Sequence, residues 1–443
     1  MAVAANTVVT MSQDEHRRQL RRALVASTVG TTIEWYDFLL YGTVSALVFG
    51  PLFFPQSDPL MGVLQSFGIF FIGFVGRPIG AAIFGHWGDR IGRKATLIAT
   101  LLLTGIATTL VGLVPTYDSI GMWGAVLLTL LRLIQGIGVG GEWGGSVLLA
   151  MEWARTNKNR GLLSSWPQFG APCGLFLANV AVLGFSELSG DQFNVWGWRI
   201  PFLISIVMVG IGMWIRLGIS ETPVFQKVIA DERIERAPVL EVLKRQPKQV
   251  ILSALLRLPE QGPGFIVGTF IFTYATTVLG QSRNFVLMAV ITQTVIGFIW
   301  VVCAGALSDY VGRKNMYMFG AAFMGIFGFV YYAMLNTGIP WVIFVAIAIS
   351  LVPVMTQYGP EAALIAESFS PRLRYSGTSI GYQSASIIAG GPSPIIATWL
   401  FATYHSSLPI ALYILLLAII GIIATALLTD YTGKDISAEY AGV

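Results

Sequence analysis

The chain has 443 residues, of which 55% are hydrophobic and only 11% are charged, and its mean hydropathy is +0.70. This composition excludes an ordinary soluble globular protein and indicates a polytopic membrane protein. The formal net charge of +4 does not indicate nucleic-acid binding, because the basic residues are divided among alternate loops.

Hydrophobic stretches with few or no charged residues follow one another along the chain. Each is long enough to provide the roughly 20 residues that cross a hydrocarbon core as a helix. Single spans are expected near 23–50, 62–87, 95–117, 122–150, 161–186, 198–216, 249–279 and 284–308. Two longer stretches, 315–360 and 375–429, each contain a polar turn with a proline, so each predicts a helical hairpin. The sequence therefore predicts an all-α membrane protein with about twelve transmembrane helices.

Lysine and arginine residues gather in every second loop of this arrangement. By the positive-inside rule, these loops and both termini are expected to be cytoplasmic. The loops lie at 17–22, 90–94, 155–160, 218–248, 313–314 and 372–374.

One segment occurs twice. Residues 85–94 read GHWGDRIGRK and residues 305–314 read GALSDYVGRK, so Asp89 and Asp309 are 220 positions (309 − 89) apart, about half the chain. An even number of spans in each half predicts parallel repeats related by an axis along the membrane normal. The expected units are a tail at 1–21, a six-helix bundle at 22–217, a cytoplasmic linker at 218–248, a second six-helix bundle at 249–430 and a tail at 431–443.

The repeated segment combines a tight turn with charges at the membrane surface. Its aspartate can accept hydrogen bonds from backbone N–H groups at a helix terminus or pair with the arginine that follows. The alternative is a basic turn that only sets the topology. The residues assigned to the two loops are Gly88, Asp89, Arg90, Gly92, Arg93, Lys94, Asp309, Gly312, Arg313 and Lys314.

The doubled segment resembles the signature loop of the major facilitator superfamily, in which this loop acts as a cytoplasmic latch between the halves during alternating access. Further segments are similar to the metabolite:proton symporter family within it: EWYDF at 34–38, RPIG at 77–80, RLIQG at 132–136, GGEWGG at 140–145 and WRIPFL at 198–203.

The resemblance covers about residues 22–429. It implies two pseudo-symmetric six-helix bundles and transport of shikimate, 2-oxoglutarate, citrate, related acids or zwitterionic osmolytes with protons. The chain reads FIVG at 265–268, where that family often has tyrosines, so the resemblance does not transfer one particular substrate.

Charged residues within the expected spans are candidates for function, because a charge in lipid is costly. Glu34 and Asp37 are three residues apart and therefore lie on one face of the first span. They either handle a proton or substrate, or form a buried ion pair. Asp37, deeper from the cytoplasmic end, is the preferred proton carrier.

The fourth span places Arg132, Gln135 and Glu142 on one face. Arg132 could pair with an ionised acid of the first span and separate from it when that acid is protonated. The alternative is a static salt bridge. The resemblance implicates the same arginine in coupling. Arg77 of the second span could bind a carboxylate substrate through its planar guanidinium or pair with an acid of the protein.

In the seventh span Arg257 and Glu260 are three residues apart and are followed by Gln261-Gly-Pro-Gly, which predicts a broken helix that lines a cavity. Proton coupling is accordingly assigned to Asp37, Glu34, Arg132 and Glu142. Substrate binding is assigned to Arg77, Arg132, Arg257, Glu260, Gln261 and Tyr358.

No metal cluster, catalytic constellation or cofactor motif is recognisable, and Cys173 and Cys303 both fall within expected spans. The sequence therefore predicts a transporter and not an enzyme. The leading hypothesis is a monomeric proton-coupled symporter of a small carboxylate-bearing metabolite, located in the inner or plasma membrane and working by alternating access. A uniporter or exchanger of an organic acid or zwitterion and a non-transporting membrane sensor are the alternatives.

Overall fold

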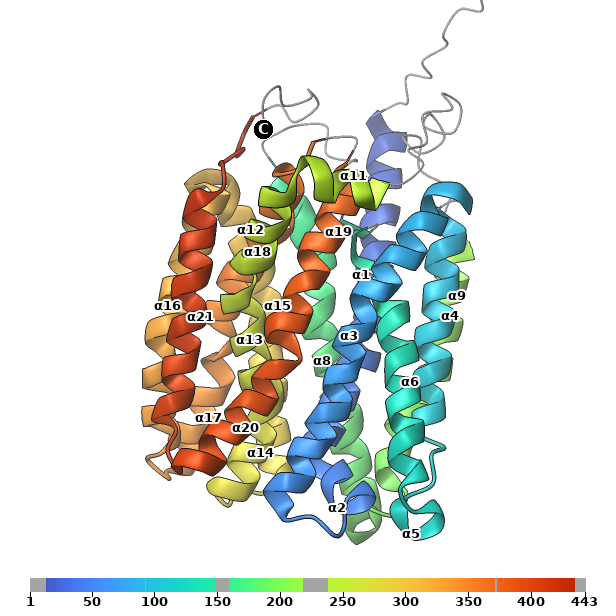
Figure 1. Cartoon of the computed structure of the whole chain (residues 1–443), viewed down its shortest axis with the longest axis vertical. Coiled ribbons are helices and arrows are strands. Elements are labelled where there is room, and N and C mark those ends of the chain that lie inside the picture. The colour runs from blue at the N-terminus through green and yellow to red at the C-terminus, as the bar shows by residue number, and fades with distance from the viewer. Residues whose placement is uncertain are drawn as a thin grey trace, which may run out of the picture.

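The computed structural model of the protein is almost entirely helical (Figure 1). It describes residues 13–91, 93–144, 146–147, 159–217, 238–370 and 373–434. Within these ranges ten helical segments are long and apolar enough to cross a membrane. The shorter apolar helix α4 (Arg93–Val111) and the segmented run from Pro247 to Val278 complete twelve.

The first half contains six spans and five short helical elements. The elements are α1 (Gln13–Val44), η1 (Ser45–Phe49), α2 (Gly50–Phe53), α3 (Pro59–Ile91), α4, α5 (Tyr117–Ile120), α6 (Trp123–Gly140), α8 (Arg160–Ser189), η2 (Gly190–Gln192), η3 (Gly197–Arg199) and α9 (Ile200–Leu217). Helix α1 begins at Gln13, so the expected tail 1–21 is helical from that residue on.

The second half begins with α11 (Pro238–Arg245), which lies in the expected linker; residues 218–237 are outside the described part. It continues with α12 (Pro247–Leu256), α13 (Leu258–Phe265), η4 (Ile266–Phe270), α14 (Ile271–Thr273), η5 (Tyr274–Val278), α15 (Arg283–Val311), α16 (Arg313–Leu335), α17 (Pro340–Ile349), α18 (Leu351–Glu367), α19 (Arg374–Ala385), η6 (Ser386–Gly390), α20 (Pro392–Tyr404) and α21 (Leu408–Leu427).

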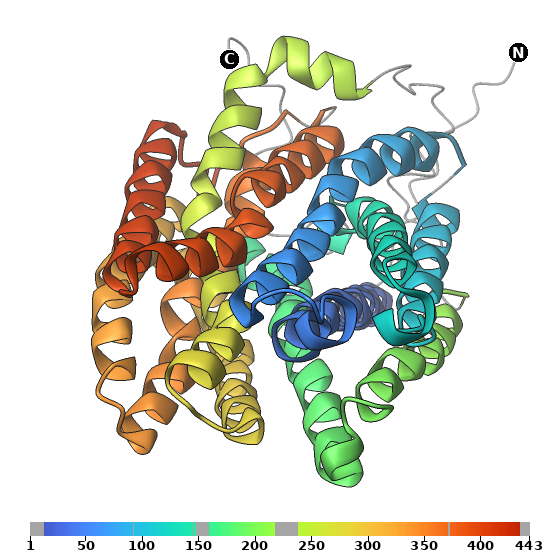
Figure 2. The ribbon, with the colours of Figure 1, turned by 60° about the horizontal axis from the view of Figure 1, so that its bottom comes forward.

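The packing within one half repeats in the other. In the first half α1 packs on α8, α3 on α6, and α4 on α9; in the second, α12 packs on α19, α15 on α18, and α16 on α21. Each pair occupies the equivalent place along its half, so the duplicated sequence corresponds to a duplicated bundle. The bundles lie side by side, seen from another direction in Figure 2.

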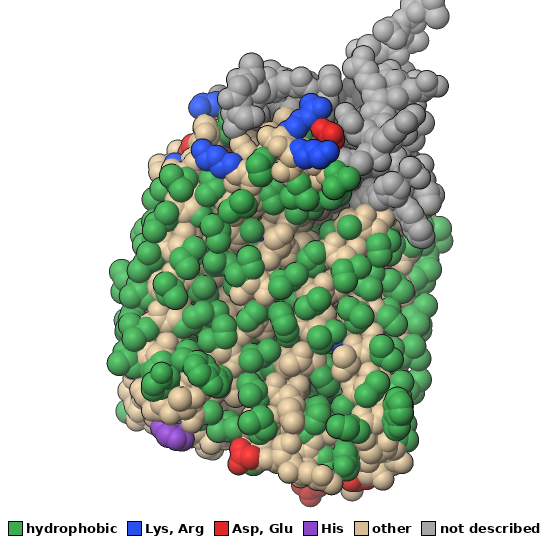
Figure 3. Space-filling view, viewed as in Figure 1, with side chains coloured by type: hydrophobic (Ala, Val, Ile, Leu, Met, Phe, Trp, Pro, Cys, Tyr) green, Lys and Arg blue, Asp and Glu red, His purple; other side chains and the backbone are tan. Residues whose placement is uncertain are grey.

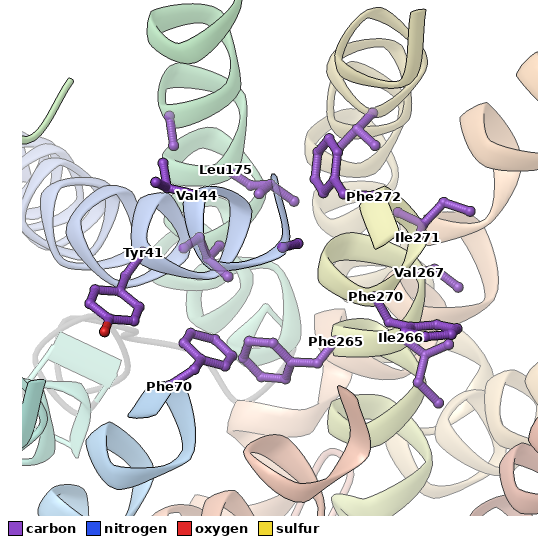
Figure 4. Packing of buried hydrophobic residues seen from close by; sticks show 14 of the residues in the cluster. Tyr41, Val44, Phe70, Leu175, Phe265, Ile266, Val267, Phe270, Ile271 and Phe272 are labelled. Atoms are coloured by element: carbon purple, nitrogen blue, oxygen red, sulfur yellow. The ribbon is translucent and has the colours of Figure 1, made fainter. Parts of the chain in front are cut away.

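The two halves meet along two seams. Helix α8 packs on α15 over a long contact, and α3 packs on α19, η6 and α20. Between the seams Phe70 and Phe265 face each other from opposite halves, with ring centroids 5.8 Å apart (Figure 4).

The outer surface is apolar, as a lipid-facing surface must be. On α21 the exposed side chains form one stripe at helical spacing, namely Leu412, Leu416, Ile419, Ile423 and Leu427. In the space-filling view, Lys and Arg side chains gather at one end of the molecule and Asp and Glu side chains are visible at the other (Figure 3). The end that carries Arg313, Lys314 and the last residue of α21 is called the basic end below.

The broken helix expected at 261–264 is not found there. Residues 258–265 form the continuous helix α13, including Pro263. The irregularities lie on either side: the helix axis is interrupted at Arg257, and the following residues form the π-helical turns η4 and η5. A π-turn appears in the first span as well, at η1.

Candidate functional site

A cavity with an empty volume of about 490 Å³ lies between the two halves. Its wall is formed by α1 and α8 of the first half and by α13, η4 and α18 of the second. The lining residues are Trp35, Leu39, Ala171, Pro172, Leu175, Glu260, Gln261, Gly264, Phe265, Gly268, Thr269, Leu351, Val354, Met355 and Tyr358. A largely apolar wall with a few polar groups is typical of small-molecule sites.

Three of the expected substrate-binding residues line this cavity: Glu260, Gln261 and Tyr358. The Gln261 amide donates to Ser386 Oγ at 3.0 Å, while its oxygen is buried and has no hydrogen-bond partner among the described residues. The Tyr358 hydroxyl lies 3.2 Å from that of Tyr382. The second half therefore supplies the carboxylate, amide and phenol groups of the wall.

Arg257 does not line the cavity and is held by the protein's own acids. Its Nε lies 2.5 Å from Glu361 Oε1, its Nη2 lies 3.2 Å from Glu260 Oε2, and its Nη1 donates to the Tyr382 carbonyl at 2.6 Å. All five donors need partners in a dry interior, and this arrangement provides three. The geometry thus favours a structural or coupling role for Arg257 over direct substrate contact.

Arg77 is buried and forms no ion pair or hydrogen bond with an acid among the described residues, although the Glu34 carboxylate interacts with it electrostatically. Its guanidinium lies over the rings of Phe38, Phe74 and Trp35, at 3.9, 4.9 and 5.3 Å from their centroids. Its Nε and Nη2 have no hydrogen-bond partner in the described part of the chain. Because Trp35 also lines the cavity, Arg77 is a cation one aromatic ring away from the space between the halves.

Arg132 is likewise surrounded by rings and not by carboxylates. It lies over Phe38, Tyr41 and Phe70 at 3.8, 4.6 and 4.7 Å. Its Nη1 donates to Gln135 Oε1, and no acid of the described residues is within ion-pair distance of it. The expected direct pairing of Arg132 with an acid of the first span is absent from this conformation.

Asp37 is completely buried in the interior of the first half, near Ser205 and Gln135. Its Oδ1 accepts from Ser205 at 2.7 Å, and its Oδ2 has no partner among the described residues. Gln135 links it to Arg132, since the Gln135 amide donates to the Asp37 carbonyl at 2.9 Å and to Thr108 at 2.7 Å. Sequence reasoning placed Gln135 on this face but gave it no role.

Glu142 is paired with a residue that sequence reasoning missed. Its carboxylate forms a buried ion pair with Arg216 near the end of α9. The available signal was an arginine within the expected sixth span. Glu34 is buried on α1. Its side chain forms no ion pair or hydrogen bond with the site residues that the structure describes.

The second copy of the repeated loop joins the two halves. The Asp309 carboxylate accepts from the backbone N–H groups of Gly161 and Leu162, both at 2.9 Å, and pairs with Arg313 at 3.0 Å. Gly161 and Leu162 open helix α8 of the first half, so Asp309 caps that helix across the interface. Arg160 and Arg313 both pair with Glu367, each at 3.2 Å.

Gly312 has a φ of +97°, which favours glycine at this turn. Lys314 donates to the carbonyls of Ala426 and Leu428, at 2.6 and 2.8 Å, within its own half. In the first copy Gly92 lies outside the described residues, and so do the side chains of Gly88, Asp89, Arg90, Arg93 and Lys94.

The arrangement of the helices matches solved transporters. A proton:xylose symporter bound to 6-bromo-6-deoxy-D-glucose superimposes with a TM-score of 0.74 at 20% identity, covering 95% of this chain and 98% of that one. A partially occluded inward-open xylose transporter from E. coli gives 0.72 over 94% and 100%. The fold is that of a secondary transporter of the major facilitator type.

Comparisons of the amino-acid sequence with known families and proteins agree with this fold. The family model described as "Sugar (and other) transporter" matches residues 22–250, and that described as "MFS/sugar transport protein" matches residues 145–425. The inner membrane metabolite transport protein YhjE of Escherichia coli (strain K12) is 41% identical, over 92% of this chain and 93% of that protein. A shikimate transporter of the same organism is 38% identical over 96% and 99%. A glycine betaine/proline/ectoine/pipecolic acid transporter of Dickeya dadantii is 30% identical over 94% and 85%.

The chain therefore belongs to the major facilitator superfamily, among its metabolite transporters. The prediction of an integral membrane transporter, in place of an enzyme, is confirmed by these relatives.

Proposed function

We propose that the protein is a proton-coupled symporter of a small carboxylate-bearing metabolite. The observation that carries the proposal is a pair of buried charges with polar atoms left unpaired among the described residues: Arg77, which lies against Trp35 of the cavity wall, and Asp37 in the interior of the first half. A buried group without a partner is costly, so its persistence favours a function that supplies the partner. A solute carboxylate would satisfy Arg77, and a proton would neutralise Asp37.

The lining of the cavity supports a small solute. Its wall is largely apolar and carries a few polar groups, from Glu260, Gln261 and Tyr358, as the walls of small-molecule sites do. We assign solute contacts to Glu260, Gln261 and Tyr358 on the wall, to Arg77 behind Trp35, and to Arg132, which lies over the same Phe38 ring as Arg77. The names of the relatives, which include a shikimate transporter, support a metabolite of this kind.

We further propose how the protein is oriented in the membrane and which of its parts move during transport. The basic end faces the cytoplasm by the positive-inside rule. Residues 22–217 and 249–430 rock as two units about the cavity, tethered by residues 218–248, with Asp309 and its first-half counterpart as latches.

A zwitterion is the second candidate for the solute. Glu260 places a carboxylate on the wall beside Trp35, Phe265 and Tyr358, and a cationic group could bind the acid and the ring faces together. The betaine transporter among the relatives supports this reading. Uptake of labelled carboxylates and betaines into energised vesicles, with and without a protonophore, tests both candidates. Uptake of carboxylates that the protonophore abolishes is expected; uptake insensitive to it would contradict proton coupling.

Asp37→Asn separates symport from uniport or exchange. We expect accumulation against a gradient to be lost and counterflow exchange of preloaded solute to persist, because the loaded carrier no longer needs the proton. Ser205→Ala is the matched control, since it removes the hydrogen bond to Asp37 Oδ1 but keeps the acid. Accumulation that persists in Asp37→Asn would exclude this residue as the proton carrier.

Arg77→Ala and Arg132→Ala test the carboxylate contact. Each is expected to weaken solute binding by about tenfold or more, as the loss of a charge-assisted hydrogen bond in a buried site does. Arg77→Lys keeps the charge but loses the planar fork and is expected to bind weakly as well. The measurement is displacement of labelled solute from purified protein. Unchanged binding in both alanine variants would rule out the arginine contact.

A further inference from the structure

We propose that Trp143 and Tyr382 form the gate that closes the cavity toward the basic end, and that Arg257 is the positioning residue that connects this gate to Glu260 on the cavity wall. The inference rests on the proposed function only in taking this cavity as the transport site. It assigns a role to two aromatic residues and redefines that of Arg257.

The two rings close the interface between the halves. Trp143 follows α6 in the first half and Tyr382 lies on α19 in the second, yet their ring centroids are 3.4 Å apart and their planes differ by only 16°. Both side chains are buried. The indole N–H donates to Gln168 Oε1 at 3.0 Å, and the Gln168 amide donates to the Tyr358 carbonyl at 3.3 Å. The stack is therefore anchored on both sides of the interface.

The stack lies between the cavity and the basic end. On one side, the Tyr382 hydroxyl is 3.2 Å from that of Tyr358, which lines the cavity. On the other side, Trp143 and Tyr382 belong to a buried cluster with Val147, Phe369 and Leu373, close to where α18 ends and α19 begins. A solute can leave the cavity toward the basic end along this seam only when the two rings separate.

Arg257 holds the second face of the Tyr382 ring. Its guanidinium carbon is 3.3 Å from the ring centroid, and since Trp143 covers one face at 3.4 Å, the arginine must cover the other. Arg257 also bonds the Tyr382 carbonyl at 2.6 Å. Ring and backbone of the gate residue are thus fixed by one side chain.

Glu260 connects the cavity wall to this gate through its ion pair with Arg257. Of the two acids that pair with Arg257, Glu361 is wholly buried away from the cavity and Glu260 lines it. A solute group that binds Glu260 removes one of the three contacts that orient Arg257, so Tyr382 becomes free to leave Trp143. Occupancy of the cavity is in this way connected to opening of the gate.

Thiol accessibility tests the gate without any solute. In a background of Cys173→Ser and Cys303→Ser, Val354→Cys places a reporter on the cavity wall. A membrane-impermeant cationic methanethiosulfonate is added to oriented vesicles on the side that exposes the basic end. Labelling of Tyr310→Cys identifies this side, because Tyr310 is exposed at the basic end. We expect Tyr382→Leu to raise the labelling rate about tenfold and Tyr382→Phe, which keeps the ring, to stay within about twofold of the parent.

Glu260→Gln tests the connection through Arg257. We expect it to raise labelling several-fold and to add nothing further in the double variant with Tyr382→Leu, because both act on the same gate. Tyr331→Leu removes a buried tyrosine of α16 outside the cavity wall and is expected to label at the parent rate. If Tyr382→Leu does not reach the membrane, Trp143→Leu makes the same test from the other half.

Labelling of Tyr382→Leu at the parent rate would overturn the assignment of Trp143 and Tyr382 as the gate. An equally faster labelling rate in Tyr331→Leu would do the same. Parent-rate labelling of Glu260→Gln would overturn its connection to the cavity. Since the assay uses neither solute nor proton gradient, these outcomes are independent of whether carboxylate uptake is observed.

Discussion

Arg77 and Asp37, like Arg132, differ in what surrounds them from the buried charges that form ion pairs. Glu142 pairs with Arg216, and Arg257 pairs with Glu260 and Glu361, so these charges are compensated within the protein. Arg77 has aromatic rings around it and unpaired nitrogens, and Asp37 keeps an unpaired oxygen. We expect the paired charges to stabilise the bundle, and we propose that Arg77 and Asp37 are available to solute and proton.

The Glu142–Arg216 pair provides a prediction of stability. Glu142→Gln leaves Arg216 buried without an acid and is expected to lower stability by about 3–5 kcal/mol. Thermal unfolding of the purified protein in detergent measures the effect. Glu241→Gln is the matched control, because Glu241 pairs with Arg245 on an exposed surface, where loss of an ion pair costs about 0–1 kcal/mol. Similar losses in both variants would contradict the distinction.

The sequence predicted several of the buried charges but missed Arg216, and it did not predict how the buried charges pair. Spacing along one helix placed Arg132, Gln135 and Glu142 on a common face, and all three are buried. It could not reveal that Arg216, on another helix, would neutralise Glu142, because a contact between helices depends on their relative depth and rotation. The same limit applies to Trp143 and Tyr382, whose contact joins segments from different halves.

Individual helices are shaped by glycines where two backbones come close. On α8, a Cβ at Gly174 would lie 2.5 Å from the Tyr36 amide nitrogen and 2.8 Å from the Thr32 carbonyl oxygen of α1. Such contacts are shorter than real side chains tolerate. At Gly184, on the same helix, nothing lies within 4 Å. A small residue at Gly174 therefore lets the backbones of α1 and α8 approach closely.

These two glycines give a matched pair of substitutions. Gly174→Ala is expected to destabilise the protein by about 1–3 kcal/mol, since α1 and α8 must separate to accommodate the methyl group. Gly184→Ala is expected to be neutral or to stabilise by up to about 1 kcal/mol, because alanine favours helix more than glycine does. Melting temperatures in detergent measure both. Equal melting temperatures for the two variants would show that the contact at Gly174 is not restrictive.

The seventh span shows how local sequence can mislead about an element. Gln261-Gly-Pro-Gly predicts unwinding, yet α13 continues through it because neighbouring helices surround the segment and Pro263 lies inside a packed helix. The distortion occurs further along as the turns η4 and η5, whose residues include Gly268 but no proline. A π-turn depends on how the helix is packed, so the sequence of the span alone did not predict it.

At the scale of the whole molecule, the halves are held together on both sides of the cavity. Near the basic end Asp309 caps α8, and at the opposite end Ser186 and Asn284 bond across the same pair of helices at 2.8 Å. Helices α8 and α15 are thus attached at both ends. The other seam joins α3 to α19, η6 and α20.

Asp309→Asn tests the attachment at the basic end. Asparagine keeps the shape but removes the charge that favours a helix N-terminus, and it replaces an acceptor oxygen with a donor. We expect the contact between halves to weaken by about 1–2 kcal/mol and the transport rate to change. Lys314→Met is the control within the same loop, since Lys314 bonds carbonyls of its own half and is expected to lower stability while leaving the contact between the halves intact.

Hydrogen exchange of the Gly161 and Leu162 amides measures that contact, because these N–H groups donate to Asp309 across the interface. Faster exchange of these amides in Asp309→Asn than in Lys314→Met is expected. The reverse order would contradict the assignment of Asp309 to the contact between the halves.

The π-turns of the first and seventh spans occupy matching places in the two halves: η1 begins at Ser45 and η4 at Ile266, and the repeated loops have their aspartates at 89 and 309. A π-turn holds one residue more than the α-helical turn it replaces. The simplest history places that extra residue in the ancestral half-length chain, before the gene was duplicated and fused. Two copies of such a chain, lying side by side in a membrane, would already have carried the same bend on each side of the space between them.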